Sequence, residues 1–254
     1  MLACLPRAES LGYSSAFQAS HHVQKDGFCP SPLIAMAGAA AVTEQMRIGT
    51  SVLLVPLYAP LKLAEDVATL DNLSNGRFVF GVAPGYVSQE FTAHNVPRAE
   101  RVGRFEEALD LITAAWSGEP FSFEGKYYRA VEAQVTPPTV QRPHPPIWLS
   151  CSRTPASYEW AGHRGYKILT IPYLSVEMAA ANNKIYVAAW EAADHPAKEW
   201  QIAAHYHCVL CESKQEAREL GREAWRRYLE ATTHTRDRAR MDGDRAAASS
   251  QPPS

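Results

Sequence analysis

Apolar runs and helical periodicities alternate along most of the chain. Residues 47–55 (RIGTSVLLV) and 77–83 (RFVFGVA) are rich in β-branched and apolar side chains, a composition typical of strands buried on both faces in a parallel sheet. Between them, apolar residues recur at i, i+4 and i+7 within 60–73, which predicts an amphipathic helix. Asn75-Gly76 follows, and glycine favours the left-handed turn that ends many helices.

The same alternation predicts further elements on both sides of this unit. We expect strands at 13–19, 147–150, 166–171 and 201–211. We expect helices at 3–12, 31–44, 97–116, 154–164, 175–193 and 214–230. Repeated strand–helix alternation favours parallel strands joined by right-handed crossovers. A doubly wound sheet shares this pattern, but no GxGxxG motif follows the early strands, which disfavours a dinucleotide-binding fold.

The α/β fold that we expect is therefore a (β/α)8 TIM-type barrel, incomplete at both ends. Only six strands are convincing, whereas a closed barrel needs eight, so two strands would present unpaired edges that invite aggregation or dimerisation. An insertion near 118–146, with FEGKYYR and the Pro-dense PPTVQRPHPP, is expected to lie extended on the barrel. We expect one barrel domain over 1–231, then a disordered polar tail over 232–254, which has almost no apolar content.

The charge balance and the cysteines exclude several classes of function. The 254 residues include 25 basic and 27 acidic side chains, a net charge of −2, which gives no electrostatic basis for binding nucleic acid or an anionic membrane. No apolar run approaches the ~20 residues that a membrane helix needs. The five cysteines are odd in number and scattered, which argues against a secreted disulfide framework. We expect a cytoplasmic protein.

Three blocks of the sequence resemble a known family. The blocks are TSVLLVPLYAPLKLAEDVATLDNLSNGRFVFGVAPGY with EF at 90–91, PPIWLS, and SYEWAGHRGYKIL. They are similar to the luciferase-like monooxygenase superfamily, from about residue 8 to about residue 230. The resemblance implies a barrel that binds reduced flavin, usually FMN, or the deazaflavin coenzyme F420, at the mouth formed by the carboxyl ends of its strands. It also implies a small-molecule substrate, O2, a separate flavin reductase as a candidate partner, and a homo-oligomer.

A histidine pair lies just past the first expected strand. The family usually shows Glu-His-His here, whereas this chain has Ser20-His21-His22. Histidine has a near-neutral pKa and serves as an acid or a base, so the resemblance implies that His21 is catalytic beside the flavin. A pair of loop histidines without a role is the alternative. Ser20 in place of the carboxylate argues against a flavin contact by that side chain.

Two other strand ends contain candidate cofactor-binding residues. In the family, a non-prolyl cis peptide at the segment of Ser51 and Val52 supports the isoalloxazine ring, although the residues alone fit a plain barrel strand equally well. Gly85 and Tyr86 follow the third strand, and glycine lets backbone approach a ligand closely; a tight strand–helix turn explains them as well. Some relatives have Arg where Pro84 stands, so an argument for ring-carbonyl or phosphate pairing here is weaker.

A hydroxyl-rich segment stands between a strand end and a helix start. It contains Ser152, Arg153, Thr154 and Ser157. Helix N-termini offer free N–H groups and a positive dipole end that suit phosphate, and hydroxyls and Arg add donors. The resemblance places the phosphate of FMN or F420 near Arg153, Thr154 and Ser157, whereas simple N-capping is the alternative.

The CxxC motif of Cys208 and Cys211 does not indicate a metal site. On a strand, positions i and i+3 point to opposite faces, and no second pair of ligands completes a zinc site. We expect structural cysteines and no metal. The leading hypothesis is a monooxygenase that uses reduced FMN and O2 on an unknown small organic substrate. The alternatives are an F420-dependent hydride-transfer oxidoreductase on the same barrel and a truncated, non-catalytic remnant.

Overall fold

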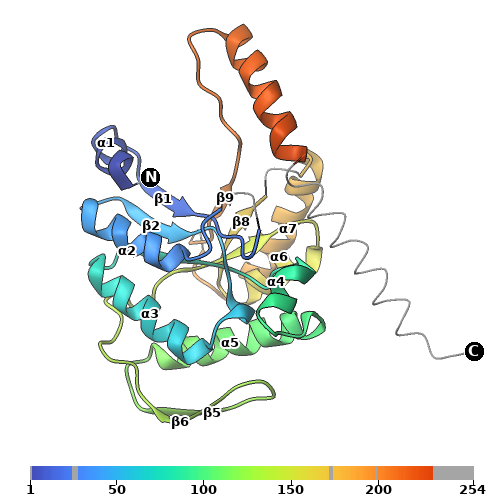
Figure 1. Cartoon of the computed structure of the whole chain (residues 1–254). Coiled ribbons are helices and arrows are strands. Elements are labelled where there is room, and N and C mark those ends of the chain that lie inside the picture. Colours follow the sequence, from blue (N-terminus) through green and yellow to red (C-terminus); the bar gives the residue numbers. More distant parts are fainter. Residues whose placement is uncertain (1, 25–27, 172–173, 198, 231–254) are drawn as a thin grey trace, which may run out of the picture.

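The main sheet is parallel throughout and is ordered along the chain. The structure, a computed structural model, describes residues 2–24, 28–171, 174–197 and 199–230. The strands of this sheet are β1 (Ser15–Gln18), β2 (Arg47–Thr50), β3 (Leu53–Leu54), β4 (Phe78–Ala83), β7 (Ile147–Cys151), β8 (Lys167–Thr170) and β9 (Ile202–Ala204). Their order is β1-β2-β4-β7-β8-β9, with β3 pairing β4, and every pair is parallel. A spatial order that follows the sequence order is what a (β/α) barrel requires, and Figure 1 shows the sheet curling.

Helices connect the strands and cover the outer face of the curled sheet (Figure 1). The longer ones are α2 (Pro32–Val42), α3 (Pro60–Leu73), α5 (Arg101–Ala115), α6 (Pro155–His163), α7 (Val176–Ala192) and a helix over 214–230. The shorter ones are α1 (Leu5–Ser10), α4 (Ser88–Ala93) and the 3-10 helices η1 (Leu2–Cys4), η2 (Val55–Leu57) and η3 (Arg98–Glu100). The sheet and its helices confirm the predicted α/β barrel architecture in the form of a half-barrel.

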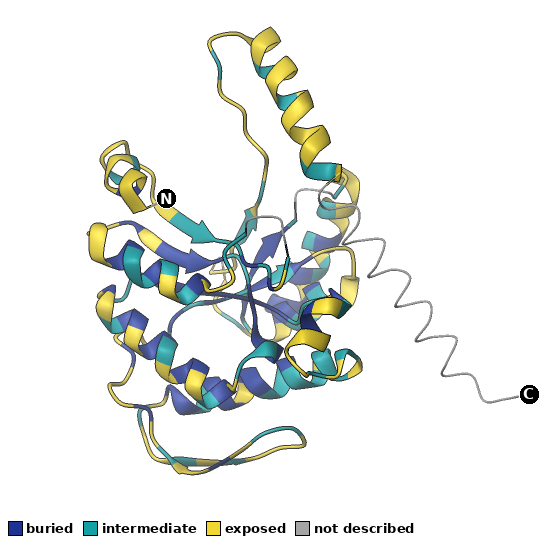
Figure 2. Ribbon diagram, in the orientation of Figure 1, coloured by how far each residue is buried: buried dark blue, intermediate teal, exposed yellow. Residues whose placement is uncertain are grey.

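The hydrophobic core lies between the sheet and the covering helices (Figure 2). All residues of β4 are buried, as expected for a central strand with both faces covered. Leu63 and Val67 of α3, and Leu109 and Ile112 of α5, are each at most 1% exposed. Burying a side chain of this size contributes roughly 1.5–3 kcal/mol, so these helices hold β4 and its carboxyl end in place.

Gly81 allows β2 and β4 to approach each other closely beside the predicted site. A Cβ atom at Gly81 would lie 1.8 Å from the carbonyl oxygen of Thr50. The hydroxyl of Thr50 donates in turn to the carbonyl oxygen of Gly81 at 2.6 Å. The missing side chain therefore lets the end of β2, where predicted cofactor residues follow, sit directly against β4.

The segment near 118–146 forms an excursion from the alternation, as predicted. It contains an antiparallel hairpin of β5 (Phe121–Glu124) and β6 (Arg129–Ala133), which lies away from the main sheet along α5 (Figure 1). The carboxylate of Glu107 on α5 accepts hydrogen bonds from the backbone N–H groups of Lys126, Tyr127 and Tyr128 at 2.7–2.9 Å. This carboxylate attaches the hairpin turn to the barrel helix.

The half-barrel is open between its first and last strands. Within the described ranges, β1 pairs only with β2 and β9 only with β8. This arrangement confirms the predicted six strand positions. The predicted domain limits of 1–231 and 232–254 stay a prediction, because the tail lies outside the described residues. Of the described helices, none is long and apolar enough to cross a membrane.

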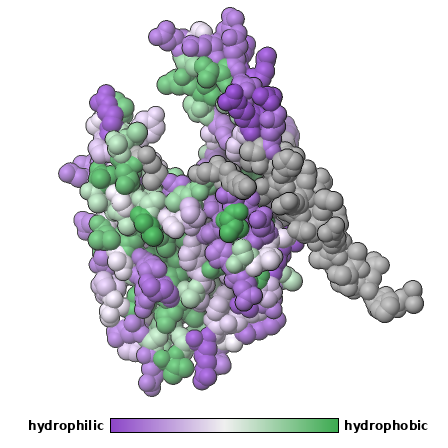
Figure 3. All heavy atoms as spheres, in the orientation of Figure 1, coloured by the Kyte–Doolittle hydropathy of each residue, from purple (hydrophilic) through white to green (hydrophobic). Residues whose placement is uncertain are grey.

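The predicted strand over 201–211 is wrong in its length. Its neighbour β8 ends at Thr170, which pairs with Ala204, so later residues have no strand to bond with on that side. Residues 205–211 leave the sheet, and with the helix over 214–230 they form an arm that projects from the barrel (Figure 1). Apolar and polar side chains mix on this arm (Figure 3), and Leu210 is 93% exposed.

Candidate cofactor site

The predicted site residues gather where the parallel strands end. Carboxyl ends of parallel strands meet at one rim of a barrel, and barrel enzymes keep their chemistry there. His21 follows β1, Ser51 follows β2, Gly85 follows β4 and Arg153 follows β7. The fold thus places residues far apart in the sequence on a common rim.

The peptide bond between Ser51 and Val52 is a non-prolyl cis peptide. It lies between β2 and β3, at the position that the family resemblance implied, and that prediction is confirmed. The hydroxyl of Ser20, which is 6% exposed, donates to the carbonyl oxygen of Val52 at 2.7 Å. Ser20 therefore binds the cis peptide segment from the neighbouring strand end.

His205 is a residue of this rim that sequence reasoning missed. Its Nε2 shares a hydrogen bond with the Ser51 hydroxyl at 3.1 Å. Its backbone N–H donates to the carbonyl oxygen of Thr170 at 3.3 Å. Burial lowers the pKa of the half-buried His205 ring below its usual value. Its position in the sequence could have indicated it: His205 comes directly after the end of β9, as His21 comes shortly after the end of β1.

His21 and His22 point into different surroundings. The His21 ring is half-buried and stacks on Phe28, with 4.4 Å between ring centroids and 25° between planes. His22 is 5% exposed, and its backbone N–H donates to the carboxylate of Glu90 at 2.9 Å. Burial, followed by the nearby His94 and His21, lowers the pKa of His22. His21 is thus the more accessible member of the pair, and His22 lies behind it.

Glu90 belongs to α4, a short helix that the sequence patterns did not predict. Gly85 precedes this helix with φ +77° and would place a Cβ atom 3.0 Å from the Phe91 ring, which explains glycine at this turn. The Tyr86 side chain is 52% exposed, and its carbonyl oxygen accepts a hydrogen bond from Arg98 at 3.0 Å. The contact with Phe91 and the positive φ explain Gly85 as a turn residue. A ligand contact by Gly85 or Tyr86 stays a prediction.

The start of α6 has several polar side chains at or near the surface. Thr154 is the N-cap residue of α6, but its side chain makes no capping hydrogen bond. Ser152, Arg153 and Thr154 are exposed and Ser157 is half-buried. The phenol of Tyr158 donates to the carbonyl oxygen of Ser152 at 2.9 Å, which holds the strand end against the helix. Simple N-capping by Thr154 is therefore not what this segment does.

The cysteine pair lies on the segment that follows β9 and His205. Cys208 is exposed and Cys211 is half-buried; both lie on the irregular segment that follows β9, so their predicted placement on a strand is wrong. In the described part of the chain, no cluster of three or more His, Cys, Asp or Glu side chains could hold a metal ion.

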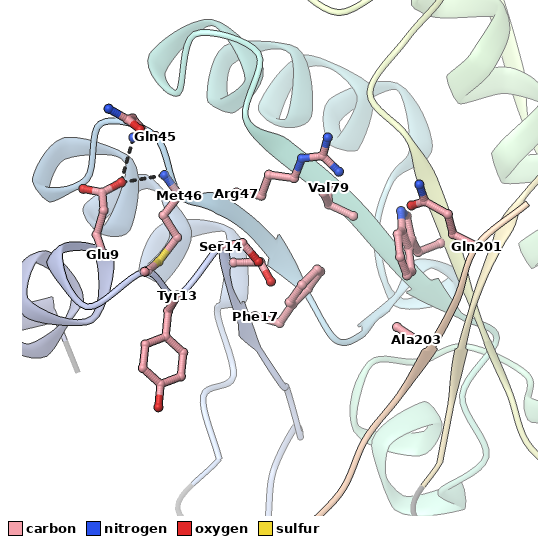
Figure 4. Close-up of a pocket in the computed structure, with 13 residues that line it drawn as sticks. Glu9, Tyr13, Ser14, Phe17, Gln45, Met46, Arg47, Val79, Gln201 and Ala203 are labelled. Carbon is pink, nitrogen blue, oxygen red and sulfur yellow. Dashed lines mark hydrogen bonds between the residues drawn. The ribbon is translucent and has the colours of Figure 1, made fainter. Parts of the chain in front are cut away.

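A cavity of about 590 Å³ opens at the other ends of the strands (Figure 4). Phe17, Val79, Trp148 and Ala203 line its inner wall. None of the predicted site residues lines this cavity. It is the interior of the open half-barrel and not the predicted cofactor site.

A model of the luciferase-like monooxygenase family matches residues 1–253. The chain belongs to the luciferase-like monooxygenase family. This family includes FMN-dependent monooxygenases and F420-dependent oxidoreductases, and its members are oxidoreductases. The cis peptide between Ser51 and Val52 and the curled parallel sheet therefore belong to a luciferase-like chain.

Three relatives illustrate the range of the family. The crystal structure of the monooxygenase RslO1 from Streptomyces bottropensis is 33% identical with a TM-score of 0.87, covering 97% of this chain and 75% of that one. The oxygenase component of the flavin-dependent trigonelline monooxygenase from Acinetobacter baylyi is 30% identical, covering 65% of this chain and 46% of that protein. An F420-dependent glucose-6-phosphate dehydrogenase from Kineococcus radiotolerans is 36% identical, covering 62% and 46%. The chain spans about half the length of the curated relatives it matches.

Proposed function

We propose that this luciferase-like protein is a flavin-dependent monooxygenase that uses reduced FMN and O2 on a small organic substrate. The observation that carries the proposal is the cis peptide of Ser51 and Val52, bonded by Ser20 on one side and by His205 on the other. Two monooxygenases among the relatives, RslO1 and the trigonelline oxygenase component, support the same class of reaction.

The residues present fit a phosphorylated flavin. The exposed guanidinium of Arg153 and the hydroxyls of Thr154 and Ser157 would hold the phosphate at the start of α6, because hydroxyls and a cation are suited to an anion. Ser51 and Val52 would support the ring from the cis peptide. Bound reduced FMN would supply the electrons with which O2 is activated.

His21 is the residue that we assign to proton transfer. Its ring is half-buried, whereas that of His22 is buried, and histidine is the side chain that most often serves as a general acid or base. Burial lowers the pKa of His22, which disfavours the charged form of that ring. Gly85 and Tyr86 would border the same site from the end of β4.

The partners that we propose follow from this chemistry. A separate flavin reductase would supply reduced FMN, and a small organic molecule and O2 would be the substrates. Strands β1 and β9 each have one unpaired edge within the described ranges, and such edges favour association with a second copy. A homo-oligomer is therefore expected, which sedimentation of the purified protein would detect.

The second candidate function is F420-dependent hydride transfer on the same half-barrel. The observation that favours it is the 36% identity to the F420-dependent glucose-6-phosphate dehydrogenase. The same donors at the start of α6 would hold the phosphate of F420. A third possibility is a non-catalytic remnant that binds flavin weakly, which the serine at position 20 and the open sheet favour.

Isotope labelling separates these functions. The purified protein is supplied with reduced FMN, 18O2 and a panel of small organic compounds, and the products are analysed by mass spectrometry. A monooxygenase incorporates one 18O atom into a product. Incorporation of none, together with substrate oxidation that reduces F420, would assign the F420 function. Binding of neither cofactor would assign the remnant.

A further inference from the structure

The hydrogen bond between Ser51 and His205 spans the mouth of the curled sheet. Ser51 follows β2 and His205 follows β9, and β4, β7 and β8 lie between these two strands in the sheet. The Ser51 Oγ and His205 Nε2 atoms are nevertheless 3.1 Å apart. The two residues therefore meet across the rim, next to the cis peptide.

The backbone of His205 is attached to the neighbouring strand β8. Its backbone N–H donates to Thr170 at the end of β8, and the Thr170 hydroxyl donates to the carbonyl oxygen of Ala203 on β9 at 3.2 Å. These bonds attach the first residue after β9 to the adjacent strand end. The backbone of His205 is thus attached beside β8, and the ring itself is bonded to Ser51.

The tautomer of His205 determines whether the Ser51 hydroxyl donates or accepts in their hydrogen bond. A neutral imidazole has one N–H donor and one acceptor nitrogen, whereas a serine hydroxyl has one hydrogen to donate. When Nε2 donates to Ser51, the Ser51 hydrogen is free to bond elsewhere; when Nε2 accepts, that hydrogen is occupied. The titratable and charged groups on the other strand ends and on α4 include His21, His22, Glu90, Cys151 and Arg153, and burial is the cause of the lowered pKa of His205.

We propose that His205 is a positioning residue that fixes the Ser51 hydroxyl at the cis peptide, so that this hydroxyl can bond to the ring of the bound flavin. The inference rests on the proposed function, since it assumes that the rim binds a flavin ring. It adds to that function a role for the segment after β9, which lies outside the family motifs in the sequence. His205 acts through Ser51 and needs no contact of its own with the ring.

A double-mutant cycle tests the inference with riboflavin as the probe. Riboflavin lacks the phosphate, so its affinity reports on the ring and the ribityl chain without the phosphate contacts. The dissociation constant is measured by flavin fluorescence for the unsubstituted protein, Ser51→Ala, His205→Ala and the double variant. Each single substitution is expected to weaken binding by about 3- to 10-fold, the range of one hydrogen bond. In the Ser51→Ala background, His205→Ala is expected to add no further loss.

Two further variants exclude a general effect on the fold. His205→Gln keeps a side-chain amide that can bond to Ser51 and is expected to restore most of the affinity. His207→Ala removes an exposed histidine whose ring contacts Trp225 and Tyr228 on the arm, and is expected to leave the affinity unchanged. A ring 15N NMR spectrum without flavin gives a second readout: the His205 Nε2 resonance should shift in Ser51→Ala.

The outcomes separate the two claims. Equal losses from His205→Ala with and without Ser51, or an unshifted His205 resonance in Ser51→Ala, would overturn the inference and leave the proposed function standing. Failure of the unsubstituted protein to bind FMN, riboflavin or F420 would overturn the proposed function and the inference together, even if the NMR shift is observed.

Discussion

The Ser20 hydroxyl donates to the carbonyl oxygen of Val52 at 2.7 Å. This bond connects the end of β1 to the cis peptide after β2 and occupies the side chain that precedes the histidine pair. The serine thus has a structural role at the rim. The contribution of this bond to stability can be measured by comparing the substitution of Ser20 with that of an exposed serine.

Replacing Ser20 by Ala is expected to destabilise the protein by about 0.5–1.5 kcal/mol. The part-buried Val52 carbonyl oxygen would lose its donor, and one such hydrogen bond contributes about that much. Urea unfolding measures the change. The matched control is Ser10→Ala, because the Ser10 hydroxyl donates to Arg7 in an exposed position; its effect should stay within about 0.5 kcal/mol. Equal effects of the two substitutions would contradict the structural role of Ser20.

Replacing Gly81 by Ala is expected to disrupt the packing of β2 against β4. A new Cβ atom would lie 1.8 Å from the Thr50 carbonyl oxygen, so the strands must separate, at a cost of about 1–3 kcal/mol or more. Thermal unfolding should show a clearly lower Tm. Gly221→Ala is the control, since its Cβ would meet nothing closer than 3.4 Å. A Gly81→Ala protein as stable as this control would refute the close approach.

Much of the fold was predictable because burial has a clear sequence signature. The apolar runs of β2 and β4 could be recognised from the sequence without knowing which strands they pair with. The same holds for the helical periodicity of α3. The cis peptide of Ser51 and Val52 was predictable only through the family resemblance, since its residues fit a plain strand. Residue type and period say nothing about a peptide bond's isomer.

Other features depended on tertiary contacts that no local pattern contains. Helix α4 has only six residues, too few for a 3.6-residue period to stand out. The segment after Ala204 is rich in apolar and aromatic residues like a strand, but it leaves the sheet because β8 has already ended. His205 was missed for the same reason: inside an assumed strand, it had no visible relation to Ser51.

Replacing His21 by Ala is expected to lower the turnover of the FMN-dependent reaction by about 10²–10⁴-fold while leaving FMN affinity nearly unchanged. A positioned acid or base contributes a factor of that size. Steady-state turnover and the FMN dissociation constant are measured on the same preparation. The exposed His207, replaced by Ala, serves as the control. Unchanged turnover in His21→Ala with normal FMN binding would remove His21 from the mechanism.

Replacing Arg153 by Ala is expected to weaken FMN more than riboflavin. The exposed guanidinium at the start of α6 would lose a charge-assisted bond to the phosphate, so the FMN dissociation constant should rise by about 10-fold, with little change for riboflavin. Arg129→Ala, on the exposed strand β6, is the control of equal charge. Equal losses for both ligands would place the phosphate elsewhere.

Acidification is expected to destabilise the protein through its buried histidines. Burial lowers the pKa values of His22 and His205 below 6.5 in the native state, so the unfolded chain binds protons more readily than the native protein. Their contribution is therefore present in full above pH 6.5 and is lost as the pH falls below 6.5 toward the lowered native pKa values. The Tm should fall more between pH 7.5 and pH 5.5, two assay conditions chosen around the ordinary histidine pKa of about 6.5, in the unsubstituted protein than in His22→Gln. Identical falls would contradict the lowered pKa of the buried His22.

An equilibrium titration of FMN with the unsubstituted protein tests most directly whether the carboxyl ends of these strands form a flavin site. Flavin fluorescence is followed as protein is added, and the same titration is repeated with F420 and with the FMN complex reduced under anaerobic conditions. The account predicts saturable binding of one FMN per chain, tighter than that of F420. Absence of saturable binding of oxidised or reduced FMN, at protein concentrations where the chain is folded, would contradict it.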